Sequence, residues 1–304
     1  MVNDRHHVSV VITTVGRDSL GLCRAALERQ TRPADETIVI HDHDRRGAAW
    51  GRNEGIRRSH GDLIAMVDDD AIPPADWLER LVRAIDTHGA DVAGGTYQET
   101  DPLLDAIRRR RPSPDDETID PGGLVGNTGN IVYRRACLLR LLQQDGYYFH
   151  EAFRPSGEDW ELILRLRKQG VTMVFVPNPV VHLRRTTAWG HLRHAFERGV
   201  GIAMLHRAVR TSSDPIVLQD SLLWGRNGQR TSPRWIAAIW EKLIGPFDRH
   251  RFQQARHFWL FWLGEKFQSA GFLWEMIQLP KPARPSPAVS TTREAPPDSL
   301  RPAA

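Results

Sequence analysis

Three consecutive aspartates, Asp68, Asp69 and Asp70, follow the apolar run 63–67 and precede two prolines. Adjacent carboxylates repel one another and aspartate is depleted in strands, so this run at the end of a buried strand needs a compensating charge. A hard divalent cation supplies it, because Mg²⁺ and Mn²⁺ prefer oxygen ligands, and Mg²⁺ leaves positions for substrate phosphates. The triplet therefore predicts a metal site for a phosphate-bearing partner. The alternative is a solvated acidic turn.

Polar residues also follow the two strands predicted ahead of this triplet. Thr13 and Thr14 end the first apolar run, and the second leads into Asp42 between His41 and His43. Ligands of an open parallel sheet bind at the carboxyl ends of its strands, so these residues predict a ligand crevice along one edge. The sequence contains neither GxGxxG nor GxxxxGK[ST], so a Rossmann dinucleotide site and a P-loop are not supported.

A second acidic feature is the pair Glu158 and Asp159, where the chain enters a predicted helix at 159–168. Acidic residues in a first helical turn often only complement the helix dipole. A carboxylate near a metal–diphosphate centre could instead act as a general base, taking the proton of an attacking hydroxyl. Both interpretations stay open at this point.

Two further features each allow a functional and a structural interpretation. His182 follows the last predicted strand, where a lone histidine is either a metal ligand or a surface residue. The segment 126–130 (GNTGN) is rich in glycine and asparagine beside an apolar strand. Such a loop lets the backbone approach a polyol closely, although an ordinary turn explains it equally well.

The elements that must position these residues alternate between strand and helix. β-branched and apolar runs predict strands, and helical spacing of apolar residues predicts helices, the first and third of them capped by Ser19 and Asp76. The strands are expected at 7–14, 37–41, 63–67, 91–95, 131–133 and 171–176, and further helices at 48–59, 136–142 and 159–168. This alternation predicts an α/β fold with a mostly parallel sheet flanked by helices. Between residues 96 and 123 the pattern fails, and the charged segment 108–117 predicts a mobile loop.

Six motifs occur in an order that is typical of one family. They are HVSVVITT (7–14), QTRPADETIVIHD (30–42), GRNEGIRRSHGDLIAMVDDDAIPPADWLERL (51–81), GNTGNIVYRR (126–135), FRPSGEDWELILRLRKQG (153–170) and VPNPVVHLRR (176–185). Together, over residues 7–200, they resemble the family-2 inverting glycosyltransferases with the A-type (GT-A) fold.

The resemblance implies a metal site and a catalytic base. In the family, the last aspartate of a DXD-type motif binds the divalent cation, Mn²⁺ or Mg²⁺, that bridges the donor diphosphate, and this position matches Asp70. A histidine after the last strand, here His182, often completes the metal shell. The aspartate of the family's ED pair is the base, which matches Asp159, with Glu158 as an acceptor or sugar contact.

The resemblance also implies a site for a sugar-nucleotide donor. Asp42 matches the aspartate that recognises the nucleotide base, and Arg52 matches an arginine near the nucleotide. The full set of donor-binding candidates is Thr13, Thr14, Asp42, Arg52, Asp68, Asp69 and Asn130. Where the family usually has Asp-Asp or Asp-Asn after the second strand, this chain has His41-Asp42-His43, so the nucleotide is not identified.

The activity implied is transfer of a sugar from a nucleoside-diphosphate sugar to a hydroxyl of a saccharide, free or lipid-linked, with inversion. One alternative is a nucleotidyltransferase, which also uses metal and carboxylates but favours a glycine-rich phosphate loop that residues 13–21 lack. Another is a non-catalytic sugar-nucleotide-binding protein, and the intact Asp70, Asp159 and His182 argue against it.

The composition divides the chain into three parts: a catalytic domain at 1–205, a helical extension at 206–279 and a proline-rich disordered tail at 280–304. The aromatic segment 256–279 has basic flanks and is expected to lie in a membrane interface, to pack on the catalytic domain or to form a homodimer. The arginine run 108–111 is either a solvated charge cluster or a contact for anionic lipid or an acceptor diphosphate.

Charge and cysteine content limit the remaining classes. A net charge of +4 over 304 residues is too small to indicate a nucleic-acid partner. Neither a signal segment nor an apolar run of about 20 residues is evident, so a cytoplasmic protein is expected, either free or peripheral on the inner face of the membrane. Cys23 and Cys137 are expected to be buried free thiols rather than a disulfide.

Overall fold

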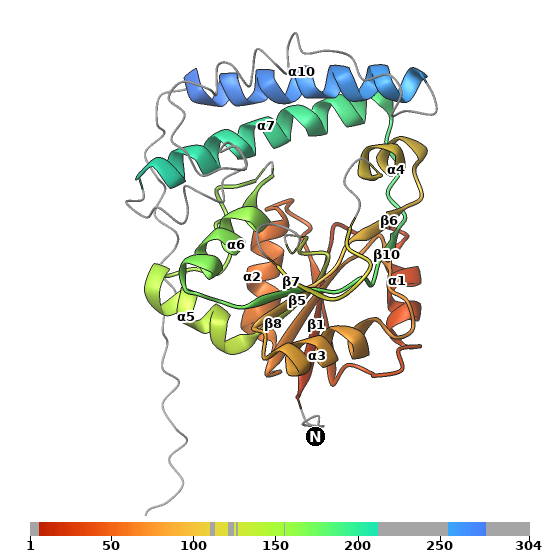
Figure 1. The fold of residues 1–304 in the computed structure, drawn as a ribbon, viewed down its shortest axis with the longest axis vertical. Coiled ribbons are helices and arrows are strands. Elements are labelled where there is room, and N and C mark those ends of the chain that lie inside the picture. Colours follow the sequence, from red (N-terminus) through yellow and green to blue (C-terminus); the bar gives the residue numbers. More distant parts are fainter. Residues whose placement is uncertain are drawn as a thin grey trace, which may run out of the picture.

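The centre of the fold is a seven-stranded mixed sheet with the order β2-β1-β3-β8-β5-β9-β7 (Figure 1). The computed structural model describes residues 6–109, 113–120, 125, 127–154, 156–211 and 255–277. The strands of the sheet are β1 (Val8–Thr14), β2 (Glu36–His41), β3 (Leu63–Asp68), β5 (Val92–Gly94), β7 (Thr118–Ile119), β8 (Asn130–Arg134) and β9 (Met173–Phe175). Strands β1, β2, β3, β5 and β9 share one direction, while β8 and β7 run against them. The predicted α/β fold is confirmed, and its sheet is largely parallel.

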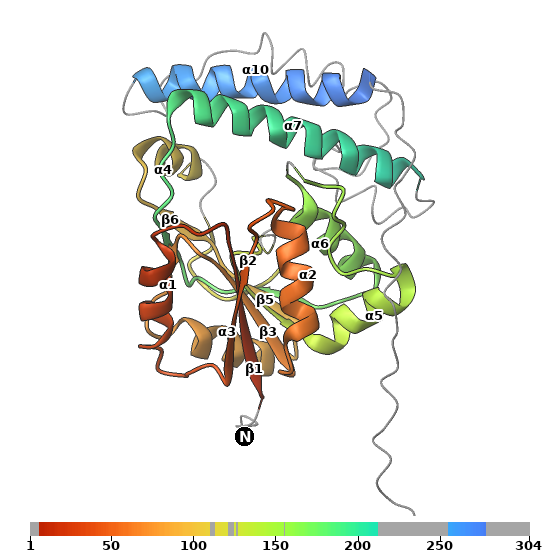
Figure 2. The same cartoon turned by 180° about the vertical axis from the view of Figure 1, so that it is seen from behind.

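Helices cover both faces of this sheet, which is why its central strands are apolar on both sides. On one face, α1 (Leu20–Leu27) and α3 (Trp77–His88) pack on β1 and β3. On the other face lie α2 (Ala48–Arg58), α5 (Arg135–Asp145) and α6 (Glu158–Lys168) (Figures 1 and 2). Cys23 belongs to the first layer and Cys137 to the second, and both are buried free thiols, as predicted.

A second, three-stranded sheet has the order β4-β10-β6. Its strands are β4 (Ala71–Ile72), β10 (Val180–His182) and β6 (Tyr97–Glu99), and β10 is antiparallel to β4 and parallel to β6. Two expectations from the sequence were wrong here. The stretch 96–123 contains β6, α4 (Pro102–Arg108) and β7 rather than only irregular structure. The strand at 171–176 is not the last one, because β10 follows it and contains His182.

The capping predictions were correct in position and wrong in mechanism. Ser19 and Asp76 stand at the N-caps of α1 and α3, but neither side chain bonds to the first turn. Asp101, which was not predicted, caps α4, because its carboxylate accepts the N–H groups of Leu103 and Leu104.

Two long helices, α7 (Ala188–Thr211) and α10 (Ala255–Ile277), lie side by side beyond the carboxyl ends of the parallel strands (Figures 1 and 2). Their backbones approach closely, because a Cβ added at Gly199 or Gly271 would overlap a carbonyl oxygen of the facing helix. Among the described residues, no helix has the length and apolar character needed to cross a bilayer. The expected domain boundary at residue 205 falls within α7. The segment 234–244 and the tail 280–304 lie outside the described residues.

Candidate active site

The small sheet places His182 beside the end of the aspartate triplet. In β10, His182 pairs with Ala71, the residue after Asp70, and on its other side with Glu99 of β6. The carbonyl oxygen of Asp70 also accepts the N–H of Leu183 at 2.7 Å. The register of this sheet therefore sets the separation between Asp70 and His182.

Asp68, Asp70 and His182 form a group that could hold a divalent metal. Each offers one ligand atom, and the three atoms lie within 4.8 Å of one another. Two carboxylate oxygens and one imidazole nitrogen suit Mn²⁺ or Mg²⁺, with substrate phosphates or water in the remaining positions. The structure thus brings together the two predicted ligands, Asp70 and His182. It adds Asp68, which the sequence placed on the sugar-nucleotide side.

Two residues of β6 that sequence reasoning missed contact this metal-binding group. Glu99 Oε2 lies 2.9 Å from Nδ1 of His182, whose Nε2 lies 3.3 Å from Asp70 Oδ1. The ring of Tyr97 stacks on the His182 imidazole with a centroid distance of 4.4 Å, and its hydroxyl donates a hydrogen bond to Asp68. No local pattern marks Tyr97 or Glu99, because their role depends on the pairing of β6 with β10.

Opposite charges stabilise the ionised forms of Asp70 and His182. Burial alone would lower the pKa of His182, but hydrogen bonds and charge from Asp70 and Glu99 raise it to about 9. Burial alone would raise the pKa of Asp70, but the hydrogen bond and charge of His182, with the Arg17 guanidinium, hold it below its ordinary value. Asp70 therefore stays ionised, as a metal ligand must.

The middle aspartate of the triplet joins strands β1 and β3. Asp69 is buried and accepts hydrogen bonds from the Thr14 hydroxyl and from Arg17 Nη1 at 2.7 Å. The same Arg17 nitrogen lies 3.0 Å from Asp70 Oδ2, so one cation serves both carboxylates. Thr14 also accepts the N–H of Gly16, which turns the chain after β1 at a φ of +88°. Arg17 was not predicted, because no pattern in the sequence connects it to the triplet.

Asp42 and Thr13 lie on the neighbouring strand ends. The Asp42 carboxylate is buried and accepts the N–H groups of Arg46 and Gly47 at 2.8 and 2.7 Å. It therefore fixes the turn that leads into α2. The side chain of Thr13 packs against Gly51 of α2, where an added Cβ would come within 2.8 Å of its methyl group.

Arg52 of α2 connects the metal-binding group to the acidic pair of α6. It is buried, its Nη1 donates to Glu158 Oε1 at 2.7 Å, and its Nη2 lies 3.5 Å from Asp68 Oδ1. The two carboxylates raise its pKa, against the effect of burial. The acidic pair and the aspartate triplet, 88 residues apart between Asp70 and Glu158, therefore belong to one continuous charge cluster.

Asp159 occupies the first turn of α6, after the positive-φ N-cap Gly157. Burial and the neighbouring charge of Glu158 raise its pKa to about 7, while Arg52 opposes the increase. A carboxylate with a pKa near neutrality is suited to accept a proton in a general-base step. The Glu158 carboxylate differs from that of Asp159, because it is paired with Arg52.

The GNTGN segment has a structural role within its described residues. Asn130 is 0% exposed, accepts the indole N–H of Trp77 at 2.8 Å and donates to the carbonyls of Thr96 and Asn178 at 2.9 Å. These bonds engage the Asn130 side chain inside the protein, and its predicted donor contact stays a prediction. At Gly129 a Cβ would overlap the Tyr97 hydroxyl and the Asp68 carboxylate, so glycine is needed for that contact.

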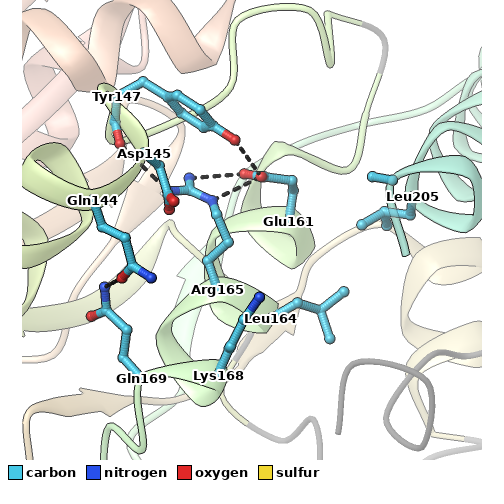
Figure 3. Close-up of a pocket in the computed structure, with 10 residues that line it drawn as sticks. Gln144, Asp145, Tyr147, Glu161, Leu164, Arg165, Lys168, Gln169 and Leu205 are labelled. Carbon is cyan, nitrogen blue, oxygen red and sulfur yellow. Dashed lines mark hydrogen bonds and ion pairs between the residues drawn. The ribbon is translucent and has the colours of Figure 1, made fainter. Parts of the chain in front are cut away.

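A cavity of about 220 Å³ lies elsewhere, along α5, α6 and α7 (Figure 3). Its walls include Arg165, Glu161 and Tyr147, which are bonded to one another: Arg165 Nε lies 2.8 Å and the Tyr147 hydroxyl 3.1 Å from Glu161 Oε1. None of the predicted site residues lines this cavity.

The chain is similar in sequence to known glycosyltransferases and to a polysaccharide biosynthesis protein. Residues 23–152 match the family model described as glycosyl transferase family 2. The glucosyl-dolichyl phosphate glucuronosyltransferase of Haloferax volcanii is 40% identical over 63 residues, 20% of this chain and 20% of that protein. The succinoglycan biosynthesis protein ExoM of Rhizobium meliloti is 25% identical over 226 residues, 62% of this chain and 72% of that protein. The chain spans about a fifth of the length of two curated relatives that it matches, 22% of glycosyltransferase AglE of Haloferax volcanii and 20% of the glucuronosyltransferase.

Among solved structures, the chain resembles mannosyltransferase PcManGT from Pyrobaculum calidifontis in complex with GDP-Man and Mn²⁺. The TM-score is 0.54 at 15% identity, over 90% of this chain and 88% of that one. At this level of identity, the similarity concerns the fold.

Proposed function

Residues 23–152 belong to glycosyl transferase family 2, on a fold of the GT-A type, and from this premise we propose that the protein is a metal-dependent inverting glycosyltransferase. It would transfer a sugar from a nucleoside-diphosphate sugar to a hydroxyl of an acceptor. The observation that carries the proposal is the charge cluster in which Arg52 connects Asp68, beside Asp70 and His182, to Glu158, beside Asp159.

Each part of this cluster has a task in such a reaction. A divalent cation held by Asp68, Asp70 and His182 would supply electrostatic stabilisation of the leaving nucleoside diphosphate. Asp159 accepts the proton of the acceptor hydroxyl as that oxygen attacks the anomeric carbon from the face opposite the leaving group. Glu158 and Arg52 hold the first turn of α6 beside the metal-binding group.

The donor is inferred from the acidic site and from the relatives. PcManGT was solved with GDP-Man and Mn²⁺, which supports a sugar nucleotide and Mn²⁺ here. Asp42, Thr13 and Arg52 remain the candidates for donor contacts. Asp42 already binds two backbone N–H groups, so a nucleotide base would be recognised by the remaining lone pairs of its carboxylate.

The acceptor is inferred from the relatives and from α10. One relative is by name a glucosyl-dolichyl phosphate glucuronosyltransferase and another a succinoglycan biosynthesis protein, so a saccharide acceptor on a lipid carrier is the proposal. Trp259, Leu263, Ala270, Trp274 and Ile277 are exposed and recur at helical spacing on one face of α10. Trp274 is 59% and Ile277 80% exposed. Tryptophan and aliphatic residues on one helix face suit the interface of a lipid bilayer, here the cytoplasmic face.

The activity is tested by incubating the protein with Mn²⁺, single nucleoside-diphosphate sugars and a lipid-linked saccharide, and identifying the products. The proposal expects a free nucleoside diphosphate and a glycoside of inverted configuration. A nucleotidyltransferase would release inorganic pyrophosphate or consume it. A non-catalytic protein would be stabilised by the donor without turning it over. Either of these results would refute the proposal.

The lipid contact is tested by flotation with vesicles of anionic lipid. A variant carrying Leu263→Glu and Trp274→Glu should lose vesicle binding, because charge on this face opposes insertion. Leu139→Glu is the matched control, since Leu139 is an exposed leucine on α5, away from α10. Unchanged flotation of the double variant, or a dimer in ultracentrifugation that the double variant disrupts, would contradict the lipid assignment.

A further inference from the structure

Strand β6 presents two buried polar side chains to the metal-binding group. Tyr97 and Glu99 are separated by one residue, so they project from the same face of the strand. The side chain of Glu99 is 6% exposed and that of His182 9%. A carboxylate and an imidazole buried at this level are costly unless each has defined partners.

Both oxygens of Glu99 are in use, which fixes the orientation of the carboxylate. Oε2 lies 2.9 Å from Nδ1 of His182, and Oε1 lies 3.3 Å from Nη2 of Arg108. Arg108 is itself held by Thr96 and lies over the Tyr97 ring at 5.7 Å. The carboxylate is therefore held from two sides.

The contact with Nδ1 determines what the other imidazole nitrogen can do. When Nδ1–H donates to a carboxylate, Nε2 is the nitrogen left to act as a ligand, and the ring is fixed in orientation. In this structure Nε2 faces Asp70 at 3.3 Å, inside the metal-binding group.

Tyr97 acts on two members of the same group. Its ring is stacked on His182 at an interplanar angle of 17°, which blocks rotation of the imidazole. Its hydroxyl donates to Asp68, whose other oxygen lies near Arg52. One strand thus contacts a carboxylate ligand and the imidazole ligand together.

We propose that Glu99 and Tyr97 are positioning residues of the metal site, with Glu99 presenting Nε2 of His182 and Tyr97 holding Asp68. The inference rests on the metal-dependent function proposed above. Because Mg²⁺ is a hard cation that takes oxygen ligands, the nitrogen ligand that Glu99 presents favours Mn²⁺ in the competition between them.

The test measures binding of Mn²⁺ alone by the electron paramagnetic resonance signal of the free ion. Glu99→Ala should weaken Mn²⁺ binding by about 10–100-fold, the range found when such supporting partners are removed. Binding of Mg²⁺, measured by competition, should fall less. Glu99→Gln, which keeps an acceptor oxygen, should recover part of the Mn²⁺ affinity. Tyr97→Phe keeps the stacked ring and should cause a smaller loss than Glu99→Ala.

Two control variants separate positioning from general packing. Glu117→Ala removes the partner of His88, a comparable histidine–glutamate contact at 3.0 Å outside the site, and should leave Mn²⁺ binding unchanged. Arg108→Gln removes the second contact of Glu99 and should cost less than Glu99→Ala. Thermal unfolding without metal confirms that the variants are folded.

The outcomes distinguish this inference from the proposed function. If the wild-type protein binds Mn²⁺ and Glu99→Ala binds it equally well, the positioning role is refuted and the proposed transfer reaction stands. An equal loss in Glu99→Ala and Glu117→Ala, or an equal loss for Mn²⁺ and Mg²⁺, would also refute it. Absence of Mn²⁺ binding by the wild type would refute both.

Discussion

Asp70 and Asp159 are the same side chain in opposite surroundings. Asp70 lies between His182 and Arg17, and these cations hold its pKa below the ordinary value despite burial. Asp159 lies beside Glu158, and burial together with that charge raises its pKa to about 7. One environment keeps a carboxylate ionised, as a metal ligand must be, and the other prepares a carboxylate to exchange a proton near neutral pH. The two roles proposed for these residues, metal ligand for Asp70 and base for Asp159, therefore rest on their surroundings rather than on the residue type.

Replacing the proposed base should produce the largest effect. Asp159→Asn removes the proton acceptor but leaves the metal-binding group intact, so the transfer rate should fall by about 10²–10⁴-fold. Donor affinity, measured by calorimetry with Mn²⁺, should change little. Glu161→Gln, in the same turn of α6, is the control and should retain most of the activity. Equal transfer rates for wild type and Asp159→Asn would remove Asp159 from this role.

Removing the metal, or Asp70 as its proposed ligand, should also reduce transfer. Chelation should abolish transfer, and added Mn²⁺ should restore it. Asp70→Asn should weaken Mn²⁺ binding by about 10–100-fold or more, because it removes a charged ligand rather than a supporting contact. Asp69→Asn is the variant to compare with Asp70→Asn. Asp69 bonds to Thr14 and Arg17 and is not part of the metal-binding group. A protein that transfers sugar at full rate in excess chelator would contradict this account.

The pH dependence of transfer should report on Asp159. A base must be deprotonated, so kcat/KM should rise as pH increases and level off above about 7, falling roughly tenfold per unit below that pH. Arg52 lowers the pKa of Asp159, so Arg52→Gln should move the midpoint to higher pH. A rate profile that stays flat from about pH 5 to about pH 8 would show that no general base titrates in this range.

The stability of the metal-free protein should show a smaller effect, from His182. Its pKa is about 9 in the folded state against 6.5 for the free side chain. Protonated His182 therefore stabilises the folded state fully below pH 6.5, and this contribution is lost as pH rises through 9. The effect is on the order of 2 kcal/mol in the free energy of unfolding. Urea titrations across this range should show the decline, and His182→Gln should remove most of it. A decline of the same size in the variant would assign it to other groups.

The strand ends that carry the site could be predicted because their signal is local. Runs such as 8–14 and 63–67 are apolar and β-branched, and a parallel sheet places their carboxyl ends on one edge. That reasoning indicated the triplet 68–70 and raised Asp159 and His182 with open interpretations, and the resemblance to family-2 glycosyltransferases implied the roles of Asp70, Asp159 and His182. The strand pattern and the family resemblance together predict that these three residues lie in one site.

The contacts that support the site could not be predicted, because they depend on non-local pairing. β6 and β10 are three residues each, too short for a period to be visible, and only their register places Glu99 beside His182. Arg17 lies in the turn after β1, and its pairing with Asp69 and Asp70 joins residues more than 50 positions apart. The internal bonds of Asn130 could not be predicted either, because its partner Trp77 lies on a helix 53 residues away in the sequence.

The most direct test of the central claim is a crystal structure with Mn²⁺ and a nucleoside diphosphate, with anomalous diffraction data collected near the manganese edge. We expect one anomalous peak at ligand distance, about 2–2.5 Å, from Asp70 and from Nε2 of His182, in contact with the diphosphate. Asp159 should face the space beyond the diphosphate where an acceptor would enter. A peak away from both residues, with the nucleotide bound elsewhere, would contradict the account.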